Sequence, residues 1–123
     1  MKRNQGFTLV EIMIVVLIIG LLAAIAVPNF TKARKKAQRN ACIDNLRQIE
    51  GACEQLKMEG VTSPTSSDIY GADKYIKIAP TCPSTKAAYG IPEGDARPVC
   101  PNPNINGDGD DERHELPGGT TTP

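Results

Sequence analysis

Residues 2–27 read KRNQGFTLVEIMIVVLIIGLLAAIAV, a short basic leader followed by an apolar run that contains one carboxylate, Glu11. The run from Phe7 to Val27 would span roughly 31 Å as a helix, enough to cross a bilayer. A charge near the middle of a bilayer costs about 2.5–3.5 kcal/mol, so an ordinary membrane anchor has no reason to carry Glu11. We therefore expect Glu11 to find a partner when the helix leaves the lipid for a protein assembly.

The composition limits the classes of function. The chain has 123 residues, room for one domain at most, and its 14 Lys and Arg balance its 14 Asp and Glu. The net charge therefore gives no case for nucleic-acid binding, and the basic stretch 32–39 lacks the interleaved aromatic residues of a base-stacking surface. His114 is the single histidine, which removes the usual His-based catalytic sets. An enzyme is the least favoured class, because no acid–base or nucleophile set is visible.

Three processing fates compete for the apolar run. The run would remain as a plain signal anchor if no enzyme cut it. Signal peptidase could cut after Ala26, because residues 24–26 fit its small-x-small rule. A cut after Gly6 would instead remove only the leader and leave the whole hydrophobic helix on the product.

The third fate is supported by a family resemblance. The sequence GFTLVE at residues 6–11, the Ile/Leu/Val-rich run after it and Pro28 beyond it resemble the N-terminus of type IV pilins and type II secretion pseudopilins. The resemblance implies that a prepilin peptidase/methylase cuts after Gly6 and methylates Phe7. It also implies that Glu11 is the assembly carboxylate, and that the helices pack in the centre of a homo-oligomeric helical filament. The resemblance implies no cofactor except calcium, which some major pseudopilins bind in their C-terminal part.

Physical chemistry gives each of these positions a task. Cutting before Phe7 creates a positive α-amine just inside the apolar region, where a carboxylate on a neighbouring helix could neutralise it. Such a pair would set the subunit register if both charges were buried together. Glycine at the cut lets the backbone enter a peptidase cleft without a side chain in the way. Pro28 lacks an N–H and is expected to kink or locally melt the helix near the membrane boundary.

The resemblance also implies a location. The subunit would sit in the inner membrane before assembly, with its C-terminal head outside the cytoplasm and an inner-membrane assembly platform as partner. It would then become part of a periplasmic or extracellular filament. Counting the basic residues that flank the run predicts the reverse orientation. We follow the family orientation, because four cysteines favour an oxidising compartment and the leader must meet a cytoplasmic-face peptidase.

Past Asn29 the chain continues to read as helix to about Met58, and Gly60 is a plausible stop. Apolar residues recur there at steps of 4, 3, 4 and 3, which predicts one stripe facing a core. The stripe consists of Cys42, Leu46, Ile49, Cys53 and Leu56. The predicted organisation is a leader (1–6), a transmembrane or filament-core helix (7–30), the amphipathic half of the same helix (31–59), a small globular head (60–117) and a disordered tail (118–123).

The head is rich in Pro and Gly and has little apolar mass. A short helix is expected from Ser67 and Asp68 through Lys77. Residues 87–91 and 96–100, separated by Pro-Glu-Gly-Asp at 92–95, predict a hairpin. The predicted fold class is α+β, in which one long helix packs on a small head with a short antiparallel β-sheet.

Disulfide bonds between the cysteines are expected to stabilise this head. Cys42 and Cys53 would lie about 16 Å apart along one helix face, too far to bond each other. Two outcomes stay open: both bridges link helix to head, or Cys82 pairs with Cys100 while the helix thiols stay reduced. The family resemblance slightly favours the second outcome, because a C-terminal loop closed by a disulfide is frequent in pilins.

A candidate calcium site lies in the acidic C-terminal part of the chain. Residues 104–115 match a relaxed calcium-loop pattern, although the first position is Asn and no flanking helices are expected. The ligand candidates are Asn104, Asn106, Asp108, Asp110 and Glu115. A plain acidic turn is the favoured alternative.

These observations favour a structural, pilin-like filament subunit without catalytic residues of its own. The machine, a type IV pilus or a type II secretion pseudopilus, is not specified by the sequence. The competing class is a small binding domain, secreted or membrane-anchored and stabilised by disulfides or calcium, that uses the apolar run only for export.

Overall fold

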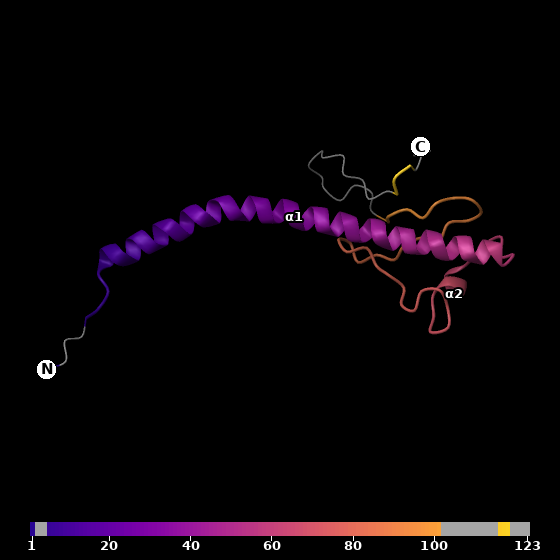
Figure 1. Cartoon of the computed structure of the whole chain (residues 1–123), viewed down its shortest axis with the longest axis horizontal. Coiled ribbons are helices and arrows are strands. Elements are labelled where there is room, and N and C mark those ends of the chain that lie inside the picture. Colours follow the sequence, from indigo (N-terminus) through magenta and orange to yellow (C-terminus); the bar gives the residue numbers. More distant parts are fainter. Residues whose placement is uncertain (2–4, 102–115, 119–123) are drawn as a thin grey trace. The chain divides into compact units, whose positions relative to one another are not determined.

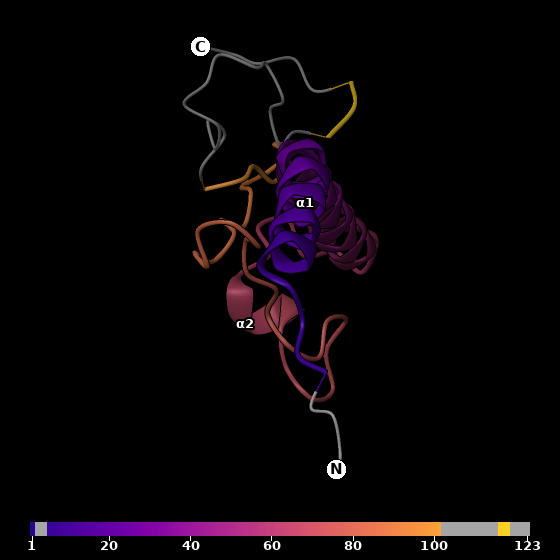
Figure 2. The same ribbon diagram turned by 90° about the vertical axis from the view of Figure 1, so that its left-hand side faces the viewer.

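The computed structural model describes residues 1, 5–101 and 116–118. It contains a long helix, α1 (Leu9–Met58), and a single-turn helix, α2 (Ser66–Ile69), labelled in Figure 1. The chain divides into two compact units, Met1–Lys35 and Lys36–Pro123. The long apolar helix and the small head of the prediction are therefore confirmed. The described segments after Met58 lie along the last part of α1 in Figure 1, and Figure 2 shows the same chain turned so that α1 is seen nearly end-on.

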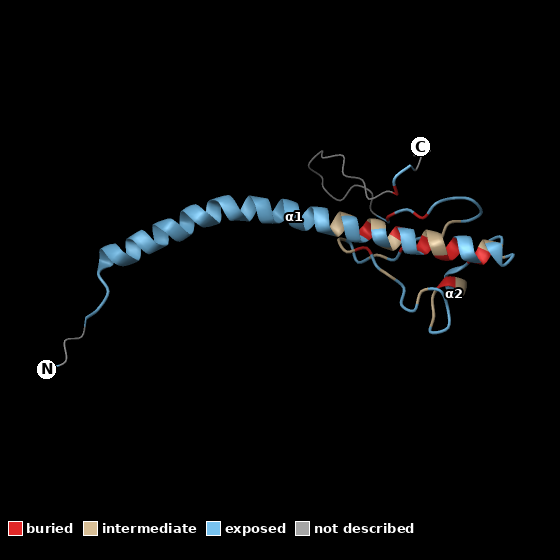
Figure 3. Ribbon diagram, viewed as in Figure 1, coloured by how far each residue is buried: buried red, intermediate tan, exposed pale blue. Residues whose placement is uncertain are grey.

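The first unit buries nothing of its apolar helix. Every described residue from Gln5 to Lys36 is exposed, and this part of α1 is uniformly pale blue in Figure 3. An 18-residue window of α1 has a mean hydropathy of 3.0, and none of that window is buried. By length and composition alone, this part of α1 could cross a membrane. An apolar surface of this size is stable only against lipid or other apolar helices.

Pro28 does not interrupt α1, and the predicted local melting there is not observed. Proline removes only one backbone hydrogen bond from the helix, and the neighbouring turns keep their own. The hydroxyl of Thr31 donates to the Pro28 carbonyl oxygen at 2.9 Å, within the same continuous helix.

The second unit is built on the predicted stripe of α1, which is confirmed. All five stripe residues are buried, and Ala52 joins them (Figure 3). Leu46 and Ile49 are fully buried. The head covers the stripe with buried side chains from four of its segments, namely Ile69, Cys82, Tyr89, Cys100 and Leu116.

α1 ends in the way the sequence predicted. Gly60 has a φ of 96°, and the N–H of Val61 donates to the Leu56 carbonyl at 3.0 Å. The N–H of Gly60 donates to the Lys57 carbonyl, also at 3.0 Å. This pair of bonds is a Schellman motif, in which a residue in the left-handed conformation closes the helix and glycine carries no strain.

Replacement by alanine is expected to change the free energy of unfolding in opposite directions at two glycines, one inside α1 and one just after its end. Gly60→Ala should lower the free energy of unfolding by about 1–2 kcal/mol, because its positive φ strains a residue that has a Cβ. Gly51→Ala should raise it by about 0.5–1 kcal/mol, since Gly51 lies inside α1 and an added Cβ meets nothing within 4 Å. Urea denaturation of the full chain in detergent micelles measures both, and equal signs would contradict this account.

The predicted β-sheet is not found, because the described residues contain no strand. Two isolated bridges take its place, Tyr70 with Ile76 in parallel and Thr81 with Ala88 in antiparallel orientation. The predicted hairpin between 87–91 and 96–100 is wrong, because residue 88 pairs instead with residue 81. Prolines at 92 and 98 lack the N–H that a ladder requires.

The predicted helix from Ser67 through Lys77 is much shorter than expected. It begins at Ser66 and ends at Ile69, and Tyr70 is already extended (φ −105°, ψ 132°). The N–H of Ile76 donates to the Ile69 carbonyl at 3.0 Å, which turns the chain back on itself. Thr65 and Asp68 form a capping box at the start of this helix.

Candidate functional site

The predicted processing site lies in a non-helical segment ahead of α1. Residues 5–8 have no regular structure, and Phe7 is 86% exposed. A Cβ added to Gly6 would meet nothing within 4 Å, so the fold itself does not require glycine at this position. The backbone around the predicted cut is therefore accessible to a peptidase.

Glu11 is held at the first turn of α1 by Thr8. Its Oε2 accepts the Thr8 N–H at 2.7 Å and the Thr8 hydroxyl at 2.9 Å. In return, the N–H of Glu11 donates to Thr8 Oγ1 at 3.3 Å. This is a capping box, and it satisfies N–H groups at the helix start that would otherwise lack partners.

The capping box gives Glu11 a local task that our sequence analysis missed. The signal was present, because Thr8-x-x-Glu11 ahead of an apolar run is the pattern of such a box. Contrary to our expectation, even an ordinary membrane anchor therefore has a reason to carry Glu11, namely to cap its helix. Glu11 nevertheless remains an exposed carboxylate on an apolar helix, next to the predicted position of a new α-amine.

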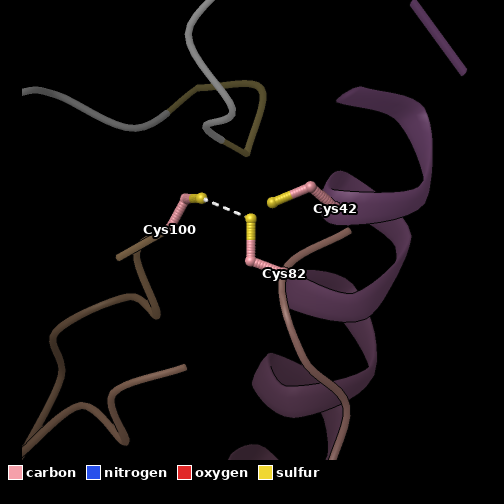
Figure 4. Close-up of side chains that lie close together, drawn as sticks. All are labelled: Cys42, Cys82 and Cys100. Atoms are coloured by element: carbon pink, nitrogen blue, oxygen red, sulfur yellow. Dashed lines mark hydrogen bonds between the residues drawn. The ribbon is translucent and has the colours of Figure 1, made fainter. Parts of the chain in front are cut away.

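The head brings three of the four candidate cysteines together. The Sγ atoms of Cys42, Cys82 and Cys100 all lie within 4.8 Å of one another, and the Cys82 and Cys100 sulfurs are 3.7 Å apart. Figure 4 shows the three side chains pointing toward one another from α1 and from two segments of the head. Cys53 is also buried but does not belong to the group. We call Cys42, Cys82 and Cys100 the thiol cluster.

Hydrogen bonds fix the thiol cluster in place. The hydroxyl of Tyr89 donates to Cys42 Sγ at 3.2 Å and accepts from Asn45 Nδ2 at 3.3 Å. Burial, together with the bond to Cys42, raises the pKa of Tyr89, so its hydroxyl stays protonated and remains a donor. Sequence analysis did not single out Tyr89 or Asn45, because the segment that carries Tyr89 was assigned to a hairpin.

The surroundings of Cys82 lower the pKa of its thiol. Burial raises the pKa of its thiol, but hydrogen bonds from the side chains and backbone of Ser84 and Thr85 outweigh burial and lower that pKa to about 6. The Ser84 Oγ lies 3.1 Å from the Cys82 sulfur. At neutral pH the sulfur is therefore largely a thiolate, the form that acts as nucleophile and metal ligand.

The five calcium candidates, Asn104 to Glu115, lie outside the described residues, and the site stays a prediction. The two disulfide outcomes also stay predictions. The geometry brings Cys82 near Cys100 and adds Cys42, and no disulfide is formed among the described residues.

Comparison with known proteins identifies the N-terminal part. The family described as the prokaryotic N-terminal methylation motif matches residues 1–27. The chain is 41% identical over 66 residues to the type II secretion system core protein G of Klebsiella pneumoniae, covering 54% of this chain and 47% of that protein. It is 34% identical over 87 residues to core protein G of Escherichia coli K12, covering 71% of this chain and 58% of that protein.

A pilin is also among the relatives. The chain is 53% identical over 47 residues to the type IV major pilin protein PilA of Myxococcus xanthus, covering 38% of this chain and 21% of that protein. The chain spans about half the length of the core G proteins that it matches, and no solved structure matches it. Residues 1–27 therefore carry the prokaryotic N-terminal methylation motif, and the proteins to which the chain is similar include both type II secretion core G proteins and a type IV major pilin.

Proposed function

We propose that this chain is a structural subunit, not an enzyme, that assembles through its N-terminal helix into a type IV pilus or a type II secretion pseudopilus. The observation that carries the proposal is the apolar part of α1, residues 9–30, which is exposed along its whole length in the single chain. Lipid can cover this surface before assembly, and the same helices of other copies can cover it afterwards. One surface then serves both states of the subunit.

The proposal includes processing and location. A prepilin peptidase/methylase cuts after Gly6 and methylates Phe7, and an inner-membrane platform then extracts the subunit. The head lies outside the cytoplasm during this step, and the finished filament is periplasmic or extracellular. The accessible backbone ahead of α1 and the match of residues 1–27 to the methylation motif support this sequence of events.

Glu11 has two tasks in this proposal. It caps α1 through Thr8, and in the filament it neutralises the α-amine of Phe7 on a neighbouring subunit. The two tasks are compatible because a carboxylate accepts several hydrogen bonds through its two oxygens. Pro28 is proposed to ease bending of α1 as the subunit leaves the bilayer, since it removes one backbone hydrogen bond from the helix.

Substitution of Gly6 tests the processing step. Gly6→Leu should block cleavage, so the uncut chain accumulates in the membrane and no filament forms. The fold tolerates the change, because a Cβ at this position meets nothing within 4 Å. Gln5→Leu places the same bulk one residue earlier and serves as the control, which should be cut like the wild type. The mass of the chain in the membrane fraction gives the readout, and normal cutting of Gly6→Leu would contradict the proposed cleavage site.

A further inference from the structure

The thiol cluster contains one sulfur more than a disulfide can use. Cys42 comes from α1, Cys82 from the segment paired with residue 88, and Cys100 from the last segment before residue 102 (Figure 4). All three side chains are buried, with exposed fractions of 0%, 0% and 3% respectively. A disulfide between any two of them would leave the third thiol within 4.8 Å of both bonded sulfurs.

The spacing of the three sulfurs suits one metal ion. Metal–thiolate bonds of about 2.3 Å place two sulfur ligands of the same ion roughly 3.8–4.0 Å apart in tetrahedral or trigonal geometry. The Cys82 and Cys100 sulfurs are 3.7 Å apart, and the third lies within 4.8 Å of each. If the longer sulfur–sulfur distances shortened by less than 1 Å, all three sulfurs would therefore lie within bonding distance of one metal ion.

The surroundings of the cluster hold the sulfurs where such an ion needs them. Tyr89 donates to Cys42 Sγ, and Asn45 fixes the Tyr89 oxygen. Ser84 lies within hydrogen-bond distance of the Cys82 sulfur. Partners of this kind orient the ligands in metal sites and are commonly needed for full affinity.

Cys53 provides an internal comparison. It lies on the same face of α1 and is 3% exposed, yet it stands outside the cluster. Burial in this core therefore does not by itself bring thiols together. Cys53 behaves as a small hydrophobic residue, which is common for buried cysteine.

We propose that Cys42, Cys82 and Cys100 form a three-thiolate site for one d10 metal ion, Cu(I) or Zn(II). Thiolate sulfur is the ligand type that both ions favour. Each sulfur binds as the thiolate, any proton that it still carries passes to solvent, and no electron is transferred. Three sulfurs complete the coordination of Cu(I), whereas Zn(II) would add a water molecule as its fourth ligand. The bound ion ties two head segments to α1, and it excludes the Cys82–Cys100 disulfide.

Metal titration of the full-length, reduced chain in detergent micelles without oxygen tests the proposal. Zn(II) and Cu(I) are added separately, each in competition with a chromogenic chelator. The expected result is one ion per chain for at least one of them, and the ion that wins identifies the site. Bound metal should slow the alkylation of Cys42, Cys82 and Cys100 relative to the metal-free chain, whereas mass spectrometry should find the slow alkylation of the buried Cys53 unchanged by metal.

Two serine variants make the result specific. Cys42→Ser should lower the affinity at least 100-fold, because it leaves only two sulfurs. Cys53→Ser is the matched control on the same helix face and should bind one ion as the wild type does. Near-ultraviolet circular dichroism of the head tyrosines checks that both variants fold. Binding of neither ion by the folded, reduced chain would overturn the site, as would equal losses in both variants or a metal-free Cys82–Cys100 disulfide in chains isolated from their own cells.

Discussion

Replacing Glu11 with glutamine is expected to abolish filament assembly while leaving α1 intact. Glutamine at this position can still accept the Thr8 N–H, so the capping box survives. The change removes only the charge, and the α-amine of Phe7 would then be buried in the filament without a partner. Breaking a buried ion pair costs about 3–5 kcal/mol, which is more than a 100-fold loss in subunit association at each contact.

Thr8→Val separates the two tasks that we propose for Glu11. This variant loses the hydroxyl that donates to the carboxylate and accepts from the Glu11 N–H, but it keeps the charge. It should lose only about 1 kcal/mol of local helix stability and should still assemble. Electron microscopy of sheared cells and sedimentation of the filament fraction give the readout. Normal assembly of Glu11→Gln together with failure of Thr8→Val would show that Glu11 acts as a cap alone.

Leu46→Ala is expected to unfold most of the head near physiological temperature. Leu46 is fully buried in the stripe, and truncation of such a leucine costs about 2–5 kcal/mol through lost burial and the cavity left behind. The whole stability of a small domain is only about 5–15 kcal/mol. The midpoint of thermal unfolding should therefore fall by about 10 °C or more.

The tyrosines make this loss measurable without interference from the long helix. The chain has three tyrosines and no tryptophan, and all three tyrosines lie in the second unit. The tyrosine band of the near-ultraviolet circular dichroism spectrum, followed during heating in micelles, therefore reports the head alone. Leu17→Ala is the matched control, since Leu17 lies on the same helix but is 73% exposed in the single chain. An equal shift in both variants would contradict the assignment of the core to the stripe.

The sequence was most informative where one local rule decides the structure. The steps of 4 and 3 between Cys42 and Leu56 place five side chains on one face, and the head covers that face. Gly60 closes the helix because few other residues accept its φ. The apolar run also predicted a long helix correctly, because each residue in it favours or tolerates the helical conformation.

The sequence was least informative where segments from different parts of the chain meet. Residue 88 pairs with residue 81, whereas the sequence predicted that 87–91 would pair with 96–100. In a proline-rich head, the backbone pairs depend on how each segment packs against the stripe of α1, which local sequence does not specify. The thiol cluster joins a helix to two separate loops, so spacing alone could not single out Cys42 as its third member. The capping box at Glu11, in contrast, is a local feature that the pattern Thr8-x-x-Glu11 predicts.

The most direct test of the filament account is the intact mass and N-terminal sequence of the protein isolated from its own cells. The account predicts a chain that begins at Phe7 and carries one additional methyl group. A chain that begins at Val27 would contradict it and leave a secreted head that used the apolar run for export. An uncut chain that begins at Met1 would contradict it as well, since it would mean a simple membrane anchor.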